Sequence, residues 1–293
     1  MMRNMVYGIR SFNHIGDSII TAGAVHNVKV AYPDALFRYV GHAPEMWLHN
    51  PDVTDRPVDV TLPKVCYESV EHERRANRGN VVEAFTATLC RLLGIPMVPL
   101  ATRVPYAVLS DEERERAEKW RGAVLLNANG QTVSFSKAYP HWQEVVDGLC
   151  NEFPIVQVGS RERRNISPSL ERVRDWRGKS ENLRDFMAMV AGCRGVISPP
   201  SGIINIAAAF GKMAVVVNGA RELEGLTAYP GMAHVSAFWP RCRSGKDWAC
   251  IALTENGQRR CRDVVTVRGE RFAACMEAVD PMAIVEAARR VLK

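Results

Sequence analysis

The residues best placed to do chemistry lie in one stretch, Ser198–Lys212. It reads as the end of an apolar strand, a turn broken by two prolines, and then an apolar helix for which Ser201 is a good N-cap. The first N–H groups of such a helix are free and sit at the positive end of its dipole. The backbone of Ser201, Gly202 and Ile203 therefore predicts an anion site, suited to a diphosphate.

A strand–turn–helix unit of this kind is also common as a plain crossover that binds nothing. The elements around it decide between the two readings. In the first part of the chain, alternating patterns predict strands at 5–9, 36–41 and 58–62 and helices at 18–31, 46–50 and 81–93. Further on, they predict strands at 123–127, 154–159, 195–198 and 214–218 and helices at 111–120, 139–153, 182–193, 203–210 and 281–292.

This order predicts an α/β protein with two consecutive Rossmann-like domains. Three prolines between 94 and 105 mark the best linker. We therefore expect an N-terminal domain at 1–105 and a C-terminal domain at 106–293.

The bulk composition is that of an ordinary globular protein of 293 residues, 47% hydrophobic and 24% charged. No apolar run reaches the roughly 18 residues that a membrane helix needs, and the first residues do not resemble a secretory signal. We expect a cytoplasmic protein without a transmembrane segment. The net charge of +6 suits an anionic partner such as a nucleotide sugar, a phosphorylated glycan, a nucleic acid or an anionic membrane surface.

Four elements, in order, resemble the family 9 glycosyltransferases, the ADP-heptose:lipopolysaccharide heptosyltransferases and their relatives. They are Ile15-Gly16-Asp17-Ser18 with Lys29–Ala35, the Lys137-containing segment 136–142, the Gly178-Lys179 segment 175–186, and the stretch 198–212. The chain departs from the family motifs at three positions: Pro200 stands in place of Asp, Asn205 in place of His, and Tyr139 in place of Trp. The resemblance implies a GT-B fold, with two Rossmann-like domains facing a cleft, and sugar transfer from a nucleotide-diphospho-sugar, an ADP-sugar being favoured.

The resemblance also implies roles for individual residues. Asp17, expected in the first strand-to-helix loop, matches the general base of the family; the alternative is a helix N-cap. Lys137 matches a cation for the diphosphate, and the alternative is a solvated lysine. The predicted donor-binding residues are Lys137, Ser201, Gly202, Ile203, Asn205, Arg161 and Glu162, and the predicted acceptor-binding residues are His14 and Asn13. Asn127, at the end of a predicted strand, is a weaker candidate for binding sugar hydroxyls. GT-B enzymes usually work without a catalytic metal, so we expect no cofactor for catalysis.

Four of the eight cysteines, Cys242, Cys250, Cys261 and Cys275, lie in an Arg- and Gly-rich region near the end of the chain. Four thiolates can hold a structural Zn²⁺ or Fe, although no Cys-x-x-Cys pair is present. Some relatives of the family carry a cysteine metal finger near this place. The alternatives are buried core cysteines or a disulfide.

Two functions from different classes follow. The first is a glycosyltransferase whose acceptor is a lipopolysaccharide core, a protein or a modified DNA base; a basic loop at 74–78 could contact phosphates. The second is a non-catalytic protein that binds nucleotides or sugar phosphates on the same scaffold. A third possibility is an unrelated α/β enzyme such as an epimerase; the absence of an early Gly-x-Gly-x-x-Gly after the first strand argues against a dinucleotide cofactor.

Overall fold

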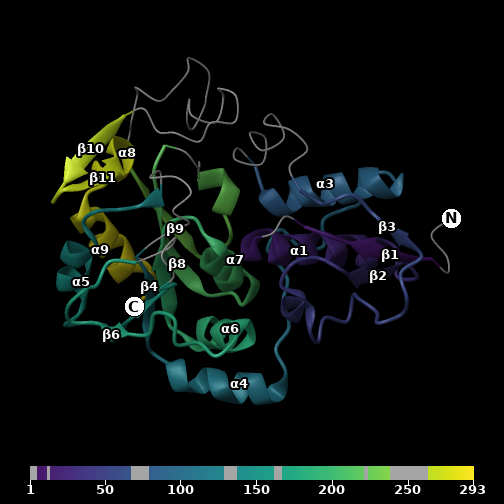
Figure 1. Cartoon of the computed structure of the whole chain (residues 1–293), viewed down its shortest axis with the longest axis horizontal. Coiled ribbons are helices and arrows are strands. Elements are labelled where there is room, and N and C mark those ends of the chain that lie inside the picture. The colour runs from purple at the N-terminus through teal and green to yellow at the C-terminus, as the bar shows by residue number, and fades with distance from the viewer. Residues whose placement is uncertain are drawn as a thin grey trace.

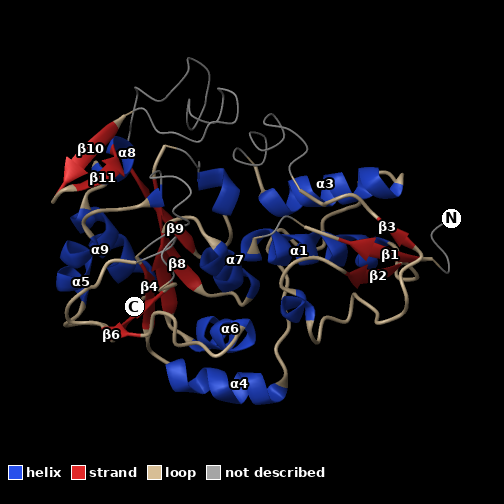
Figure 2. Ribbon diagram, viewed as in Figure 1, coloured by secondary structure: helices blue, strands red, loops and turns tan. Residues whose placement is uncertain are grey.

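The computed structural model describes residues 5–11, 14–66, 79–128, 137–161, 167–220, 224–237 and 263–293. Two separate parallel sheets, one in each half of the chain, carry helices around them (Figures 1 and 2). The fold class predicted from the sequence, α/β with two Rossmann-like units, is confirmed. No helix among the described residues is long and apolar enough to cross a membrane.

The N-terminal half has a small parallel sheet of strand order β2-β1-β3. Its elements are β1 (Val6–Ile9), α1 (Ile15–Ala31), β2 (Leu36–Tyr39), the 3-10 helix η1 (Pro44–Trp47), β3 (Val60–Thr61) and α3 (Val81–Leu93). The helix α3 packs against α1 beside the sheet (Figure 1). It begins at Asn80, whose side chain accepts from the N–H groups of Val82 and Glu83, and it ends at Gly94, whose φ of 66° suits glycine.

The C-terminal half is built on a six-stranded parallel sheet of order β6-β5-β4-β7-β8-β9. Its strands are β4 (Val124–Asn127), β5 (Ile155–Val158), β6 (Arg174–Asp175), β7 (Gly195–Ser198), β8 (Met213–Asn218) and β9 (Met232–Ser236). Its helices are α4 (Asp111–Ala117), η2 (Glu118–Trp120), α5 (Trp142–Leu149), α6 (Leu183–Gly192), α7 (Gly202–Ala209), η4 (Glu224–Thr227) and α9 (Pro281–Val291). A hairpin of β10 (Val264–Val267) and β11 (Glu270–Ala273) leads into the short helix α8 (Ala274–Glu277).

Successive residues of the central strands enter opposite cores, because side chains alternate along a strand. In β8, Val216 packs on the face covered by α6 and α7, whereas Val215 and Val217 pack on the face covered by α5 and α9. Both faces of the sheet are thus buried, which explains why these strands are continuous apolar runs rather than alternating ones.

The first of these cores continues into the N-terminal half. Ile19 and Ile20 of α1, with Met46 and Trp47 of η1, belong to the same buried cluster as the residues of α6 and α7. The predicted boundary at 105/106 separates the two sheets, but the apolar core crosses it.

The sequence missed or misjudged several elements. The helix predicted at 139–153 is shorter and begins only at Trp142. The hairpin β10–β11, with α8, lies where little regular structure was expected. The helix predicted as exposed at 111–120 buries Glu113, which forms an ion pair with Arg184 of α6 and completes a capping box with Ser110.

Candidate functional site

The strand order places the topological switch point of the larger sheet between β4 and β7. From β4 the chain adds strands in one direction, through β5 and β6, and then returns to add β7, β8 and β9 on the other side. Ligands of open α/β sheets bind at such switch points, where the loops diverge. Asn127 ends β4 and Ser198 ends β7, and the Asn127 Nδ2 donates to Ser198 Oγ over 3.0 Å. The stretch 198–212 therefore lies at the position where this fold binds ligands.

The helix α7 begins at this switch point without a side-chain cap. Ser201 is its N-cap residue, as predicted, but its side chain makes no capping hydrogen bond. Instead, Ser201 Oγ lies 2.9 Å from Ser198 Oγ and accepts from Asn127 Nδ2 over 3.3 Å. The first turn of α7 also contains no acidic residue. Among the described residues, then, no side chain caps the backbone donors of Gly202 and Ile203, and no carboxylate of that first turn offsets the dipole.

Lys137 reaches the same turn from the loop that follows β4. Its Nζ donates to the carbonyl oxygen of Pro200 over 2.9 Å. This contact places an ammonium group next to the N-terminus of α7, and the predicted role of Lys137 toward a diphosphate stays a prediction.

Asp17 lies at the N-terminus of another helix, α1, which follows β1. The helix begins at Ile15 with His14 as its N-cap residue, so Asp17 is in the first turn and is neither the cap nor part of a preceding loop, as the sequence had suggested. His14 makes no side-chain cap. The Asp17 carboxylate is partly exposed and is the only acidic group in that turn.

The first turns of α1 and α7 meet closely at two glycines. A Cβ built on Gly202 would lie 3.5 Å from the backbone nitrogen of Gly16. A Cβ built on Gly16 would lie only 2.8 Å from the Nδ2 of Asn205. The predicted base, the uncapped helix end and Asn205 are therefore brought to one place, which we call the junction: the first turns of α1 and α7 with Asn205.

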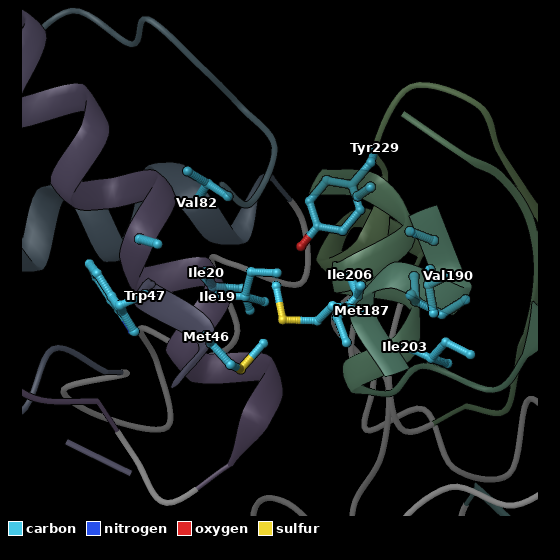
Figure 3. Packing of buried hydrophobic residues seen from close by; sticks show 14 of the residues in the cluster. Ile19, Ile20, Met46, Trp47, Val82, Met187, Val190, Ile203, Ile206 and Tyr229 are labelled. Carbon is cyan, nitrogen blue, oxygen red and sulfur yellow. The ribbon is translucent and has the colours of Figure 1, made fainter. Parts of the chain in front are cut away.

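Tyr229 contacts the junction through Asn205. It follows η4, is buried, and donates from its hydroxyl to Asn205 Oδ1 over 2.8 Å. Burial, helped by the negative charge of Asp17, raises the pKa of Tyr229 far above the ordinary value for tyrosine. Figure 3 shows this hydroxyl pointing toward the space between α1 and α7. The hydroxyl stays protonated at every ordinary pH.

Apolar packing fixes the two helices below the junction. Ile19 and Ile20 of α1 face Ile206 of α7 and Met187 of α6 (Figure 3). All four are almost fully buried. The relative position of the two first turns is thus set by well-packed side chains rather than by the polar groups themselves.

The remaining predicted residues are more scattered. Arg161 follows β5 and forms an ion pair with Asp175, with Arg161 Nη2 and Asp175 Oδ2 2.6 Å apart. Hydrogen bonds from Arg177, with a further one from Arg161, hold the pKa of Asp175 well below its usual range. His14 lies exposed at the start of α1. Asn13 and Glu162 lie outside the described residues.

The structure describes only one of the four cysteines of the predicted metal site. Cys242, Cys250 and Cys261 lie outside the described residues. Cys275 is buried in α8, within the second core, and a Cβ on Gly219 would lie 3.1 Å from its sulfur. Within the described ranges, no three His, Cys, Asp or Glu side chains are grouped as a metal site would need. The surroundings of Cys275 are typical of a core cysteine.

Two features of the site could not be predicted from the sequence. Tyr229 sits in a short Ala-Tyr-Pro-Gly turn that has no motif of its own. Ser198 was correctly predicted as the last residue of a strand, but the sequence did not indicate that its hydroxyl links Asn127 to Ser201. Both depend on contacts between segments far apart in the chain, and no local pattern signals such contacts.

Comparison with known proteins assigns the fold. No family model matches the sequence, and no curated protein does either. Solved structures do match over nearly the whole chain, and they are GT-B glycosyltransferases of family 9. The chain therefore has the GT-B fold, as the motifs implied.

Of three such structures, two are matched over almost their whole length and the third is longer than this chain. The E. coli ADP-heptose lipopolysaccharide heptosyltransferase II matches with a TM-score of 0.64 at 14% identity, covering 98% of each chain. A family 9 glycosyltransferase from Veillonella parvula matches with a TM-score of 0.63 at 12% identity, covering 100% of this chain and 98% of that one. The iron-containing dodecameric glycosyltransferase TibC from enterotoxigenic E. coli matches with a TM-score of 0.64 at 11% identity, covering 99% and 76%.

Proposed function

We propose that the protein is a glycosyltransferase that moves a sugar from a nucleotide-diphospho-sugar to a hydroxyl acceptor. One observation carries the proposal. The only carboxylate in the first turn of α1 and the uncapped first turn of α7, with Lys137 beside it, meet at a single junction. A carboxylate on one helix start, next to an anion site on another, provides the two groups that transfer from a diphosphate requires.

The chemistry assigns one task to each group. The Asp17 carboxylate takes the proton of the acceptor hydroxyl, whose oxygen forms the new bond to the anomeric carbon. The bond between that carbon and the diphosphate oxygen breaks, and the electron pair leaves with the diphosphate. The N–H groups of Gly202 and Ile203, together with the Lys137 ammonium, stabilise the growing negative charge of the leaving group.

An ADP-sugar is the favoured donor. TibC has been solved in complex with ADP-D-β-D-heptose, and the E. coli heptosyltransferase WaaC with ADP-2-deoxy-2-fluoro heptose. Both share the fold of this chain, with TM-scores of 0.62 and 0.51. We keep Arg161 and Glu162 as candidates for the nucleoside, because they follow β5, the strand beside the switch point.

The first test is a thermal-shift panel of ADP, UDP, GDP, CDP and dTDP with the matching sugar conjugates. At 100 times Kd a ligand stabilises the folded state by about 2.7 kcal/mol, which raises the melting temperature by several degrees. Stabilisation by ADP and its sugar conjugates alone supports the proposal. A flat response across the panel contradicts it.

A non-catalytic nucleotide-binding protein is the second candidate. It is favoured by Pro200, which replaces an acidic residue of the family motif, and by the tightly packed α1–α7 contact. A turnover measurement distinguishes the two functions. The transferase releases ADP from ADP-heptose when an acceptor is supplied, whereas the binding protein holds the donor intact.

The acceptor is proposed as an anionic hydroxyl compound, in keeping with the net charge of +6. A lipopolysaccharide core, a protein side chain and a modified DNA base remain the three acceptor classes, with His14 and Asn13 as acceptor-side candidates. Incubating the protein and ADP-heptose with each acceptor, and following transfer of labelled sugar, selects among them.

A structural Zn or Fe at Cys242, Cys250, Cys261 and Cys275 stays a separate proposal. TibC is described as iron-containing. The apolar surroundings of Cys275 fit a core residue better than a ligand, so Cys275 is the weakest member of the set. Metal analysis of the purified protein, with Cys90→Ser as the control for loss of a buried thiol, tests the idea: less than about half an equivalent of metal contradicts it.

A further inference from the structure

The Asn205 side chain is almost completely buried, yet only one of its two polar atoms is used. The residue as a whole is 8% exposed. Its Oδ1 accepts from the Tyr229 hydroxyl over 2.8 Å. Within the part of the chain that the structure describes, its Nδ2 has no hydrogen-bond partner, and it faces the first turn of α1 at Gly16. An unpartnered donor on a residue that is nine-tenths buried, directed at a helix start without a side-chain cap, is an observation that points to a ligand.

The Tyr229 hydroxyl determines which atom of the amide faces the junction. Asn205 Oδ1 is the only acceptor for this hydroxyl among the described residues. If the amide turned over, its Nδ2 would donate to the phenol oxygen, and the phenol hydrogen would be buried without an acceptor. That arrangement is unfavourable because a buried donor would stay unsatisfied. It would also turn Oδ1, a partial negative charge, toward the half of the junction that holds Asp17.

We infer that Tyr229 is a positioning residue that fixes the Asn205 amide with its Nδ2 facing the junction, as a donor to a diphosphate oxygen of the ligand. The inference deepens the proposed function and rests on it. Asn205 Nδ2 adds a side-chain donor to the backbone donors of Gly202 and Ile203. Diphosphate oxygens are acceptors only, so the orientation of the amide decides whether Asn205 attracts or repels the ligand.

The buried setting keeps this arrangement constant with pH. The pKa of Tyr229 is raised by burial and by the charge of Asp17, so its hydroxyl remains a donor across the range in which a transferase is assayed. Within the described part of the chain, the groups recorded as interacting with the Tyr229 hydroxyl are the Asn205 amide of α7 and the Asp17 carboxylate of α1.

The experiment measures the Kd of ADP, and of inorganic pyrophosphate as a probe without the nucleoside, by calorimetry. Tyr229→Phe removes the hydroxyl and keeps the ring that packs in the core. We expect it to weaken ADP binding roughly three- to tenfold, the range of one hydrogen bond. Asn205→Ala should weaken binding by a similar factor, and the double variant should be no weaker than Asn205→Ala alone, because Tyr229 acts through Asn205.

Asn205→Asp tests whether Asn205 contacts the ligand, because the expected change in Kd would not occur if Asn205 had only a structural role. The carboxylate keeps the shape of the side chain and can still accept from Tyr229, and a thermal melt of the variant checks that it is folded. Its second oxygen, however, faces the diphosphate with a negative charge. We expect Asn205→Asp to bind ADP and pyrophosphate more weakly than Asn205→Ala does, although it is closer in shape to the natural residue.

Tyr139→Phe is the matched control. Tyr139 is also buried, and its hydroxyl donates to Val279 O over 2.9 Å in the other core, away from the junction. Its loss should lower the melting temperature and leave the Kd of ADP unchanged.

The outcomes separate this inference from the proposed function. If the natural protein binds ADP and Tyr229→Phe binds it equally well, the inference is wrong and the proposed function stands. Additive effects of Tyr229→Phe and Asn205→Ala would likewise overturn it. If neither ADP nor pyrophosphate binds to the natural protein, both the inference and the proposed donor site fail together.

Discussion

The helices of this protein begin in two different ways. The helices α3, α4, α6 and α9 each start at an Asn, Ser or Asp whose side chain accepts from an N–H group of the first turn. The helices α1 and α7, which meet at the junction, start at His14 and Ser201 without such a bond. Only α5 and the short α8 share that lack among the described α-helices. A satisfied helix start adds stability, whereas an open one leaves donors for a ligand.

The two open starts also differ from each other. The first turn of α1 contains the Asp17 carboxylate, which complements its own dipole, while the first turn of α7 contains no acid. One end is therefore suited to accept a proton and the other to hold an anion. This difference predicts that changes at capped ends alter stability, and that changes at open ends alter binding or turnover.

The largest effect is expected at the open end of α1. Asp17→Asn keeps the size of the side chain but removes the base. Sugar transfer should fall at least a hundredfold in kcat, the lower end of the range for general base catalysis, while the Kd of ADP changes little. Transfer from ADP-heptose at saturating acceptor gives kcat, and calorimetry gives Kd. Unchanged transfer would show that Asp17 only complements the helix dipole.

The capped end of α4 should show the opposite pattern. Glu113 accepts from the Ser110 N–H over 2.8 Å and forms a buried ion pair with Arg184, both side chains being 7% exposed. Glu113→Gln removes the charge and leaves Arg184 buried without its counter-ion. The free energy of unfolding should fall by roughly 3 kcal/mol, as is usual when one partner of a buried pair is removed. Urea unfolding measures this loss, and the Kd of ADP should stay the same.

The same pair predicts how stability depends on pH. Burial raises the pKa of Glu113, but the bonds from Arg184 and Ser110 outweigh burial and lower it below the ordinary value. A carboxyl with a lowered folded-state pKa stabilises the fold above its unfolded pKa, about 4.3, and that contribution disappears as the pH falls through the folded value. Urea unfolding from pH 7 down to pH 3 should show a shallower acid loss in Glu113→Gln than in the natural protein. Parallel curves would contradict the assignment.

At the open end of α7, Lys137→Ala tests the anion site. Loss of one charge-assisted contact to a diphosphate should weaken ADP binding about tenfold or more. Lys119→Ala is the control, because Lys119 is an exposed lysine of η2, on an element that does not contribute to the junction. Equal Kd values for the two variants would mean that Lys137 only supports the Pro199–Ser201 turn.

The smallest effects are expected from a pair of glycines. Gly16→Ala places a methyl group 2.8 Å from Asn205 Nδ2, so the amide must move. The alanine in Gly202→Ala meets its neighbours at 3.5 Å or more, an ordinary contact, and gains helix propensity. We expect Gly16→Ala to lower the melting temperature by a few degrees and Gly202→Ala to leave it unchanged or raised. The reverse order would show that the two first turns are farther apart than described.

Much of this arrangement could be predicted from local patterns. The helix at Val81–Leu93 and the strands around Val124 and Val216 follow directly from apolar periodicity and from the glycines and prolines at their ends. The start of a helix at Ser201 and Gly202 was equally predictable from the local sequence. These features depend on residues that are neighbours in the chain.

The remainder depends on pairs of residues far apart in the chain. The start of α1 was predicted too late, so Asp17 was expected just before the helix rather than in its first turn. The reason is that the helix begins after His14, which provides no capping side chain and therefore no sequence signal. Tyr229 enters the site only through its contact with Asn205, 24 residues away in sequence. Glu113 looked exposed because its partner, Arg184, lies on another helix 71 residues further along.

The apolar cluster that links the two halves has a thermodynamic consequence. Ile19, Ile20, Ile206 and Met187 are buried against one another where α1 and α7 meet. Any hinge motion that separated these helices would expose their side chains to water and would therefore carry a positive heat-capacity change. The balance between a closed and an open form of the molecule then depends on temperature in a curved way, and donor binding to the closed form should show a negative heat-capacity change if it draws the halves together.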